Sequence, residues 1–534
     1  MKKPLKIKDP IFGYIFINDE ILFPIINSAL FHRLQDIIQT SYPSLYPSAV
    51  HNRFTHSLGV YYLGQIAVSK LEKDIIKHKL LSKQKLEKIS KTFLLACLLH
   101  DIGHSPFSHT GEKFYFQYAN DNKTPIIWQK LLEVLNNRSF IKDSNGLYIG
   151  AEHEIMSALV SLQNFNSILK TMDKAFFVRC IIGLKYSDKN DIRNCFIDLL
   201  NSKTIDVDKL DYLIRDSFTT GFKNVNIDYE RLLNGVCIIK EKDETFLGFE
   251  KSALSTLENV ILAHDMEKKW IQNHPVIKYE SYLISYIISK LQDYYNKKKI
   301  NLFSPEALTE HGLKVGKNKI CLLSDSDIYV FAKSFYLKDS IITEYFNRSL
   351  RKKALWKSEA EYRILFEQRG LNNEALTVLE THIRSLENML INNFDIPIIN
   401  EKSLKYLESE LQDTSIPEDI RKSKNAELTK TIELIKVIRA FSKKNKLPFE
   451  YIIINANQFS TGFNKDYFKH IKIRFSNNTI KSLESVLYLF NTQEPRKNFF
   501  YLFANAEKKE NIDVQSLTLE LIKFILDKYN KLHK

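Results

Sequence analysis

The chain has 534 residues, of which 44% are hydrophobic and 12% aromatic, and a formal net charge of +14. This length predicts two or three domains, and the hydrophobic content provides a packed core and excludes an intrinsically disordered chain. No stretch reaches the roughly 18 uncharged apolar residues that a membrane-spanning helix needs, and the N-terminus lacks the pattern of a signal peptide. We therefore expect a cytoplasmic protein that does not cross a membrane.

The cysteines and the net positive charge indicate which kinds of binding site the chain can contain. The five cysteines are scattered and never form a Cys-x-x-Cys pair, which argues against a disulfide framework and against a thiolate zinc site. The positive charge fits either solvated lysine-rich faces or the attraction of polyanions such as nucleotides and nucleic acid. Charge alone does not separate these two interpretations.

The hydrophobic pattern is mainly helical up to about residue 299. Residues 236–249 are an exception, because two apolar runs flank a charged turn there and predict a β-hairpin. Residues 360–446 are highly charged and again have a helical pattern.

The hydrophobic pattern of the sequence changes after Pro448. Apolar runs predict strands at 451–454, 470–475 and 499–503, and helical patterns lie around 480–489 and 514–529. We therefore predict a mainly α protein with a smaller C-terminal α+β lobe. Its three predicted parts are a helical catalytic core with a helical extension over 1–366, a charged helical connecting region over 367–447, and the α+β lobe over 448–534.

His56 opens a helical pattern whose apolar face continues through Val60, Leu63, Ala67 and Leu71. A histidine on such a face points toward the interior. Taken alone, a histidine in this position is most often an ordinary core residue, so it gains meaning only together with other metal-capable groups.

Three further metal-capable residues follow along the chain. His100 and Asp101 come directly after the apolar run 93–99, and Asp208 lies in a helical pattern with one apolar face and one face of Asp, Lys, Tyr and Arg. Two imidazoles and two carboxylates form a mixed nitrogen and oxygen site that suits Mn, Fe, Mg, Ni or Zn. Such a cation lowers the pKa of bound water and polarises a phosphoryl oxygen.

Residues 51–60, 100–109 and 205–212 form three sequence motifs, HNRFTHSLGV, HDIGHSPFSH and IDVDKLDY. Together and in this order they resemble the HD superfamily, and within it the branch of SAM-and-HD-domain dNTP triphosphohydrolases and bacterial dGTPase-like enzymes. The resemblance covers roughly residues 5–366 and implies an HD-domain helical bundle. It also implies attack of water on the α-phosphorus of a dNTP, which releases deoxynucleoside and intact triphosphate.

The resemblance also implies roles for individual residues. The metal ligands would be His56, His100, Asp101 and Asp208. The catalytic group would comprise His104, His109 and His153, which contact the triphosphate or protonate the leaving 5′-oxygen, with Glu112 as their acidic partner. For His109 a turn-capping role is the alternative. The candidate substrate-binding residues are Gln39, Arg53, Lys209, Tyr212, Asp216, Lys268 and Lys269, whereas an ion pair is the expected role of Arg215.

Some positions depart from the family pattern. Residues that bind a guanine-nucleotide activator in vertebrate members fall here on Asn27, His32 and Gln35, so we expect another nucleotide, a protein partner or no effector. An Arg of the family falls on His264, and a Tyr that excludes the ribose 2′-hydroxyl falls on Gln272. Lys268 and Lys269 would then replace the lost positive charge.

The resulting expectation is a homo-oligomeric dNTP triphosphohydrolase, dimer or tetramer, that uses a divalent metal ion. Its biological role would be control of dNTP pools or antiviral dNTP depletion, and binding of nucleic acid would be secondary. Two alternatives stay open: another HD phosphohydrolase, such as a nucleotidase, phosphodiesterase or nuclease, and a catalytically idle regulator that binds nucleotides or nucleic acid.

Overall fold

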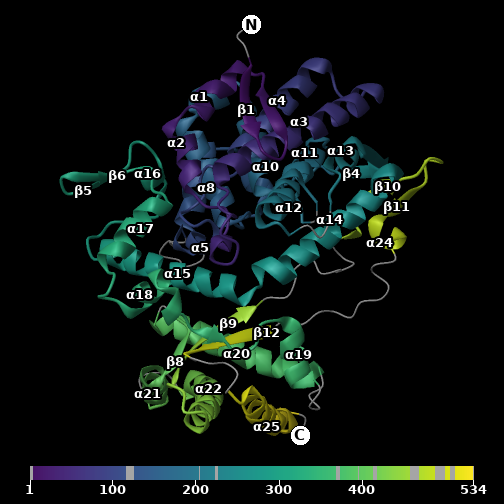
Figure 1. Cartoon of the computed structure of the whole chain (residues 1–534). Helices are drawn as coiled ribbons and strands as arrows, with labels where there is room; N and C mark the ends of the chain where they lie inside the picture. The colour runs from purple at the N-terminus through teal and green to yellow at the C-terminus, as the bar shows by residue number, and fades with distance from the viewer. Residues whose placement is uncertain are drawn as a thin grey trace. The chain divides into compact units, whose positions relative to one another are not determined.

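The computed structural model describes residues 4–115, 125–203, 205–222, 226–367, 373–394, 396–412, 418–456, 468–487, 499–505 and 512–532. The described residues are mainly helical with a few small sheets, as predicted (Figure 1). They group into two compact units. The first comprises 1–268, 290–332 and 463–494, and the second comprises 269–289, 333–462 and 495–534.

The centre of the first unit is a set of packed helices, α3 (Arg53–Lys77), α4 (Lys83–Leu99), α8 (Glu152–Asn164), α10 (Lys174–Ile182) and α12 (Val207–Thr220). Helix α3 packs against α4 and α12, and α10 packs against α4 and α8. Because every one of these helices has buried apolar residues, they form one shared hydrophobic core.

Helix α3 forms as the sequence predicts. The side chain of Asn52 caps its first turn by accepting a hydrogen bond from the backbone N–H of Thr55. The predicted apolar face is completely buried, and His56 lies on it. Helix α4 ends at Leu99, so the following His100 and Asp101 lie directly after its buried C-terminal half.

The remaining helices of the first unit are short or peripheral. They are η1 (Glu20–Leu22), α1 (Phe23–Ile26), α2 (Ala29–His32), η2 (Arg33–Asp36), η3 (Tyr42–Ser44), α5 (His109–Glu112), η4 (Lys113–Tyr115), α6 (Ile126–Leu135), α7 (Arg138–Asp143), α9 (Asn166–Leu169), α11 (Arg193–Leu200), α13 (Tyr229–Asn234), η5 (Lys251–Ala253), α14 (Leu254–Glu267) and α16 (Pro305–Leu308). Three further helices have residues in both units, namely η6 (Lys268–Gln272), α15 (Pro275–Asn296) and α17 (Asp325–Ser334).

Two hairpins of this unit stand alone as two-stranded sheets. They are β1 (Leu5–Asp9) with β2 (Gly13–Ile17), and β5 (Leu313–Val315) with β6 (Asn318–Ile320). The predicted hairpin is confirmed as β3 (Val236–Glu241) and β4 (Glu244–Glu250), and its strands belong to a four-stranded sheet with the order β11-β10-β4-β3.

The outer two strands of that sheet correct the sequence prediction. Strand β10 (Lys472–Arg474) was expected in the C-terminal lobe, but it pairs in parallel with β4. The helix expected around 480–489 is wrong at its start, where β11 (Ile480–Ser482) pairs with β10 and only α24 (Leu483–Val486) follows. Residues 488 and 489 lie outside the described residues. Long-range pairing therefore decides the structure here, against the local helical pattern.

The second unit is a small α+β structure around an antiparallel sheet. Its strand order is β7-β12-β9-β8, with β7 (Lys353–Ala354), β12 (Phe499–Ala504), β9 (Glu450–Ala456) and β8 (Ile398–Asn400). Every residue of β12 is buried, as expected of a central strand. The strands predicted at 451–454 and 499–503 are thereby confirmed.

The helices of the second unit are α18 (Ser340–Phe346), η7 (Arg348–Leu350), α19 (Glu359–Glu367), α20 (Asn373–Phe394), α21 (Glu401–Glu410), α22 (Glu418–Lys444) and α25 (Val514–Leu532). Helix α20 packs on β9 and β12, and α25 packs on α20 and α22 (Figure 1). The helix predicted at 514–529 is therefore present. Length and apolarity sufficient for a membrane span are not combined in any helix within the described ranges.

The two compact units cross the domain boundaries expected from the sequence. Residues 269–289 and 333–366, expected in the catalytic core, belong to the second unit, and 463–494 belongs to the first. The pairing of β10 with β4 accounts for the last of these differences.

Candidate metal centre and catalytic cluster

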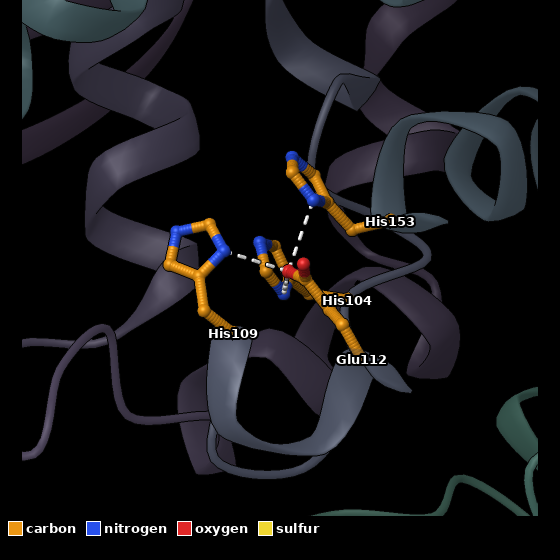
Figure 2. A group of neighbouring side chains, drawn as sticks. All are labelled: His104, His109, Glu112 and His153. Atoms are coloured by element: carbon orange, nitrogen blue, oxygen red, sulfur yellow. Dashed lines mark ion pairs between the residues drawn. The ribbon is translucent and has the colours of Figure 1, made fainter. Parts of the chain in front are cut away.

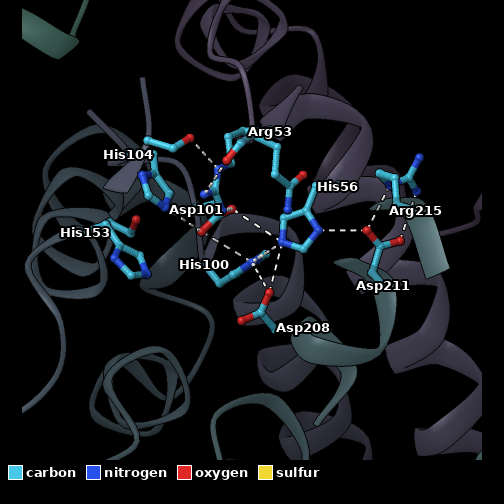
Figure 3. Close-up of polar contacts among 12 residues, drawn as sticks. Arg53, His56, His100, Asp101, His104, His153, Asp208, Asp211 and Arg215 are labelled. Atoms are coloured by element: carbon cyan, nitrogen blue, oxygen red, sulfur yellow. Dashed lines mark hydrogen bonds and ion pairs between the residues drawn. The ribbon is translucent and has the colours of Figure 1, made fainter. Parts of the chain in front are cut away.

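Three segments of the first unit bring the four predicted metal ligands together (Figure 3). His56 comes from α3, His100 and Asp101 from the end of α4, and Asp208 from the first turn of α12. Nε2 of His56 lies 3.0 Å from Oδ1 of Asp208 and 3.3 Å from Nε2 of His100. Nε2 of His100 lies 3.4 Å from Oδ1 of Asp101. Ligand atoms that share one cation at about 2.0–2.2 Å have separations of about this size.

The orientation of both imidazoles fits a bound cation. Nδ1 of His56 lies 2.7 Å from Oδ2 of Asp211, and Nδ1 of His100 lies 2.9 Å from the carbonyl oxygen of Cys97. Each Nδ1–H therefore has an acceptor, which leaves the lone pair of each Nε2 directed at the shared centre. This donor set and its outer partners fit a divalent metal ion.

Asp211 was not predicted as part of the site. Arg215 donates to both of its carboxylate oxygens at 2.9 Å, and to Oδ2 of Asp9 at 3.0 Å. All three side chains are buried, so His56 is held by a complete ion-pair network. The expected ion pair of Arg215 is present. The missed signal was helical spacing, since Asp211 lies one turn after Asp208 and one turn before Arg215.

Replacing Asp211 with asparagine is expected to lower the affinity for Mn²⁺ by about 10–100-fold, the usual effect of losing an outer partner of a ligating histidine. The amide removes the negative charge that holds the His56 imidazole while it keeps the side-chain volume. Calorimetric titration of the metal-stripped protein measures the affinity. Asp74→Asn is the matched control, because Asp74 is a buried carboxylate on α3, the helix of His56, and accepts the backbone N–H of Ile238. Equal affinities in the two variants would contradict the role of Asp211.

The charges of the site also favour a cation. Burial alone would raise the pKa of Asp101, but Arg53, His100 and His56 lower it overall. Burial likewise opposes ionisation of Asp208, but hydrogen bonds with His100 and His56 hold its pKa well below the usual range. For His56, burial lowers the pKa, yet hydrogen bonds with Asp208 and Asp211 raise it to about 9. Both candidate carboxylate ligands are therefore ionised at neutral pH, and a divalent cation would replace the proton that they stabilise on His56.

Arg53, expected to bind substrate, is already engaged beside the metal ligands. Its Nη1 lies 2.7 Å from Oδ2 of Asp101, and its Nε donates to Oγ of Ser108 at 2.9 Å. The guanidinium is buried. In this arrangement Arg53 fixes a metal ligand and the turn before His109, and its contact with substrate stays a prediction.

A second cluster contains the four residues expected to be catalytic, His104, His109, Glu112 and His153 (Figure 2). Oε1 of Glu112 lies 2.8 Å from Nδ1 of His109, 2.9 Å from Nδ1 of His153 and 3.3 Å from Nδ1 of His104. The rings of His104 and His153 stack with their centroids 4.3 Å apart. Nε2 of His104 lies 3.6 Å from Oδ1 of the candidate metal ligand Asp101, so the two clusters adjoin.

The members of this second cluster differ in their charge and exposure. Burial opposes ionisation of Glu112, but His109 and His153 hold its pKa well below the usual range. Burial lowers the pKa of His153, yet Glu112 raises it to about 9. Burial and the charge of Arg53 lower the pKa of His104 far below its usual value. His104 is therefore neutral, while the side chain of His109 is 66% exposed and accessible to a substrate.

Several expected substrate-binding residues lie where α12 and α14 pack together. The ring of Tyr212 lies 6.5 Å from that of His264, between centroids. Burial, together with the charges of Lys268 and Lys209, lowers the pKa of His264 to about 3. Nζ of Lys209 lies 2.8 Å from Oδ2 of Asp206. A basic and aromatic group of side chains therefore forms on this face.

The other expected substrate contacts have varied surroundings. Asp216 is buried and lies 2.6 Å from Nε2 of His51. Gln39 is buried, and no described residue forms a hydrogen bond with its Oε1. Lys269 belongs to the second unit, where it lines a cavity of ≈ 200 Å³ with His274 and Tyr501 among others.

Comparisons with known proteins identify a matching family and several relatives. Residues 53–140 match the family described as HD domain. The uncharacterized protein MG461 of Mycoplasma genitalium is 28% identical over 260 residues, which cover 48% of this chain and about half (53%) of that protein. The uncharacterized protein YwfO of Bacillus subtilis is 25% identical over 382 residues, 69% of this chain and 76% of that protein. Deoxynucleoside triphosphate triphosphohydrolase SAMHD1 of Mus musculus is 30% identical over 281 residues, 48% of this chain and 39% of that protein.

Solved structures show the same fold. A phosphohydrolase from Bacteroides thetaiotaomicron superposes with a TM-score of 0.55 at 20% identity, covering 94% of this chain and 100% of that one. A hypothetical protein from Aquifex aeolicus gives a TM-score of 0.52 at 17% identity, covering 97% and 100%. The three sequence motifs meet at one centre of histidine and aspartate side chains. The chain carries an HD domain and belongs to the HD phosphohydrolase superfamily.

Proposed function

We propose that this protein is a metal-dependent dNTP triphosphohydrolase. The observation that carries the proposal is the convergence of the side chains of His56, His100, Asp101 and Asp208 beside a second cluster that contains an exposed imidazole. Relatives named deoxynucleoside triphosphate triphosphohydrolases, 26–30% identical to about half of this chain, support the choice of substrate class.

The four metal ligands would hold Mn, Fe, Mg, Ni or Zn. When bound, such an ion supplies polarisation of a phosphoryl oxygen and acidification of water. Asp211 and the carbonyl of Cys97 keep the two imidazoles oriented. The basic group of Lys209 and Lys268 lies on the α12 and α14 face and would neutralise phosphate charge.

The reaction breaks the bond between the α-phosphorus and the 5′-oxygen and forms a bond from the phosphorus to a water oxygen. The leaving 5′-oxygen then needs a proton. We assign this proton to His109, since Oε1 of Glu112 lies 2.8 Å from its Nδ1 and its side chain is 66% exposed. Gln39, Tyr212 and Asp216 would contact the deoxyribose.

Product analysis tests the proposal. The purified protein is incubated with each of the four dNTPs singly and then mixed, with Mn²⁺ or Mg²⁺, and the products are separated by chromatography. Deoxynucleoside with intact triphosphate is the expected result. Release of pyrophosphate or inorganic phosphate would indicate another HD phosphohydrolase, and no turnover in any mixture would exclude the dNTP reaction. Activity in the mixture alone would indicate a nucleotide effector.

Replacing His109 with glutamine is expected to lower kcat by about 10²–10⁴-fold, the usual contribution of a general acid. Metal content is expected to stay unchanged, because His109 is not one of the four ligands. His78→Gln is the control, since this histidine caps the other end of α3 and is also exposed. If kcat falls equally in both variants, or stays unchanged in His109→Gln, the proton-donor role is wrong.

A homo-oligomeric state, a nucleotide effector or protein partner, and secondary binding of nucleic acid stay predictions from the sequence. So do the roles in dNTP-pool control and antiviral depletion. The metal centre and the second cluster both lie within one compact unit of a single chain.

A further inference from the structure

The turn directly before His109 has an unusual backbone. Phe107 and Ser108 both have left-handed φ angles, 56° and 51°. Residues other than glycine adopt this region at a cost of about 1–3 kcal/mol each, so the surrounding structure must hold them there. Because α5 begins at His109, the geometry of this turn sets where the His109 imidazole lies.

One buried carboxylate holds this turn. Oδ1 of Asp325 accepts the backbone N–H of Phe107 at 2.6 Å, and its Oδ2 accepts the backbone N–H of Ile38 at 2.8 Å. Asp325 is the first residue of α17 and is only 4% exposed. A single side chain therefore joins three segments that are more than 60 residues apart along the chain, as the sequence separations show.

Other contacts make this connection rigid. Oγ of Ser108 donates to the carbonyl of Ile38 at 2.6 Å, so the two segments are joined to each other as well as to Asp325. The buried Arg33 donates to the carbonyl of Leu323 at 2.6 Å, which fixes the backbone leading to Asp325. The ring of Phe107 packs on Tyr329, one turn further along α17.

The electrostatics agree with a carboxylate that is held by its donors. The pKa of Asp325 is raised to about 7, because burial outweighs the backbone N–H groups of Ile38 and Phe107, which act to lower it. The amides therefore stabilise the charge that burial disfavours. Removing the carboxylate would leave both N–H groups buried and unpaired.

We propose that Asp325 is a positioning residue of the active site, which fixes Phe107 and Ile38 and thereby the adjoining His109 and Gln39. It acts through the backbone and touches neither the metal ligands nor the catalytic cluster. The consequence for turnover rests on the proposed function, in which His109 donates a proton and Gln39 contacts the sugar. The structural connection itself does not.

Asp327 offers a matched control on the same turn of α17. Its carboxylate accepts hydrogen bonds from the backbone N–H and the hydroxyl of Ser324, both at the start of its own helix. An Asp327→Asn variant changes the same charge near the same place. It leaves the hydrogen bonds to Phe107 and Ile38 in place.

The test compares Asp325→Asn, Asp325→Ala and Asp327→Asn with the wild type. Hydrogen exchange by mass spectrometry follows peptides that contain Ile38 and Phe107, and kcat is measured with saturating dNTP per metal-loaded, folded molecule. We expect Asp325→Ala to lose protection in both peptides, and Asp325→Asn, which keeps one acceptor oxygen, to lose it in at least one. We expect kcat to fall about 10-fold in Asp325→Asn, which keeps one acceptor, and about 100-fold in Asp325→Ala, as for a displacement of about 1 Å. Asp327→Asn is expected to behave as the wild type.

The outcomes separate the connection, its catalytic effect and the proposed function. Unchanged protection in an Asp325 variant overturns the connection, whatever the substrate. Lost protection with unchanged kcat overturns the positioning role. If the wild type does not turn over any dNTP, the proposed function fails, and the exchange data alone still decide whether Asp325 holds the two segments. Should Asp325→Ala not fold, Asp325→Asn carries the same comparison.

Discussion

Replacing Asp208 with alanine is expected to remove the bound metal and to lower phosphohydrolase activity by about 10³-fold, the size of effect seen when a group that stabilises transition-state charge is lost. Asp208 is the ligand whose loss disturbs the protein least. Its side chain is 35% exposed, whereas His56 and Asp101 are buried and tied to Asp211 and Arg53. Metal content by mass spectrometry and dNTP turnover measure the two effects.

The Asp208 variant needs a control for the loss of a carboxylate in general. Glu87→Gln serves, because Glu87 lies exposed on α4 and pairs with Lys91. It is expected to keep both metal and activity. In the presence of a chelator, Asp208→Ala is expected to melt close to the wild type. Full metal content in Asp208→Ala would show that the cation lies elsewhere, and full activity would show that the reaction does not depend on this centre.

The convergence of the four candidate metal ligands was predictable because the information for each residue is local. His56 lies on a helix whose apolar face can be recognised from apolar residues at helical spacing. His100 and Asp101 directly follow an apolar run. The resemblance of the surrounding motifs to the HD superfamily then identified Asp208 as the fourth candidate ligand. The structure brings all four together as three helix ends or faces in one core.

The partners around the ligands were less predictable, because they depend on how distant helices pack. Nothing in the sequence shows that Asp211 faces His56, which requires α12 to lie against α3. For Glu112 the resemblance implied an acidic partner, but its contacts depend on packing, because α8 carries His153 to α5 and one oxygen of Glu112 then meets three imidazoles. Asp325 lies still further away in sequence, and its two hydrogen bonds have no local pattern.

The C-terminal part shows the same limit at the level of the fold. The short apolar run around Ile473 was recognisable as a strand, but its partner was not. The strand joins β4, and Arg474 pairs with Glu250 of that strand at 2.6 Å. A strand of three residues contains too little information to specify its neighbour, since register and pairing come from the sheet that receives it.

The close approach of α3 and α12 depends on Gly59, and its replacement with alanine tests that dependence. A Cβ atom at this position would lie 1.8 Å from Oδ1 of Asp211 and 2.6 Å from Nη2 of Arg215. Neither side chain can move without breaking the buried network with His56 and Asp9. Loss of such a network costs about 3–5 kcal/mol, and the higher helix propensity of alanine returns about 1 kcal/mol. We therefore expect Gly59→Ala to lower the free energy of unfolding by about 2–4 kcal/mol.

The same variant should also lose metal affinity, because Asp211 would no longer hold the His56 imidazole. Gly64→Ala is the matched control on α3, because an added Cβ there would meet the side-chain Sγ of Cys97 at 2.9 Å, whereas His100 contacts the backbone carbonyl of Cys97. Crowding there is expected to cost about 1–3 kcal/mol and to leave Mn²⁺ binding unchanged. Denaturant unfolding and metal titration measure the two quantities. If Gly59→Ala binds Mn²⁺ as tightly as Gly64→Ala, the His56–Asp211 contact does not govern the metal site. Weaker Mn²⁺ binding in Gly59→Ala alone would show that the absence of a side chain at Gly59 allows Asp211 on α12 to contact His56.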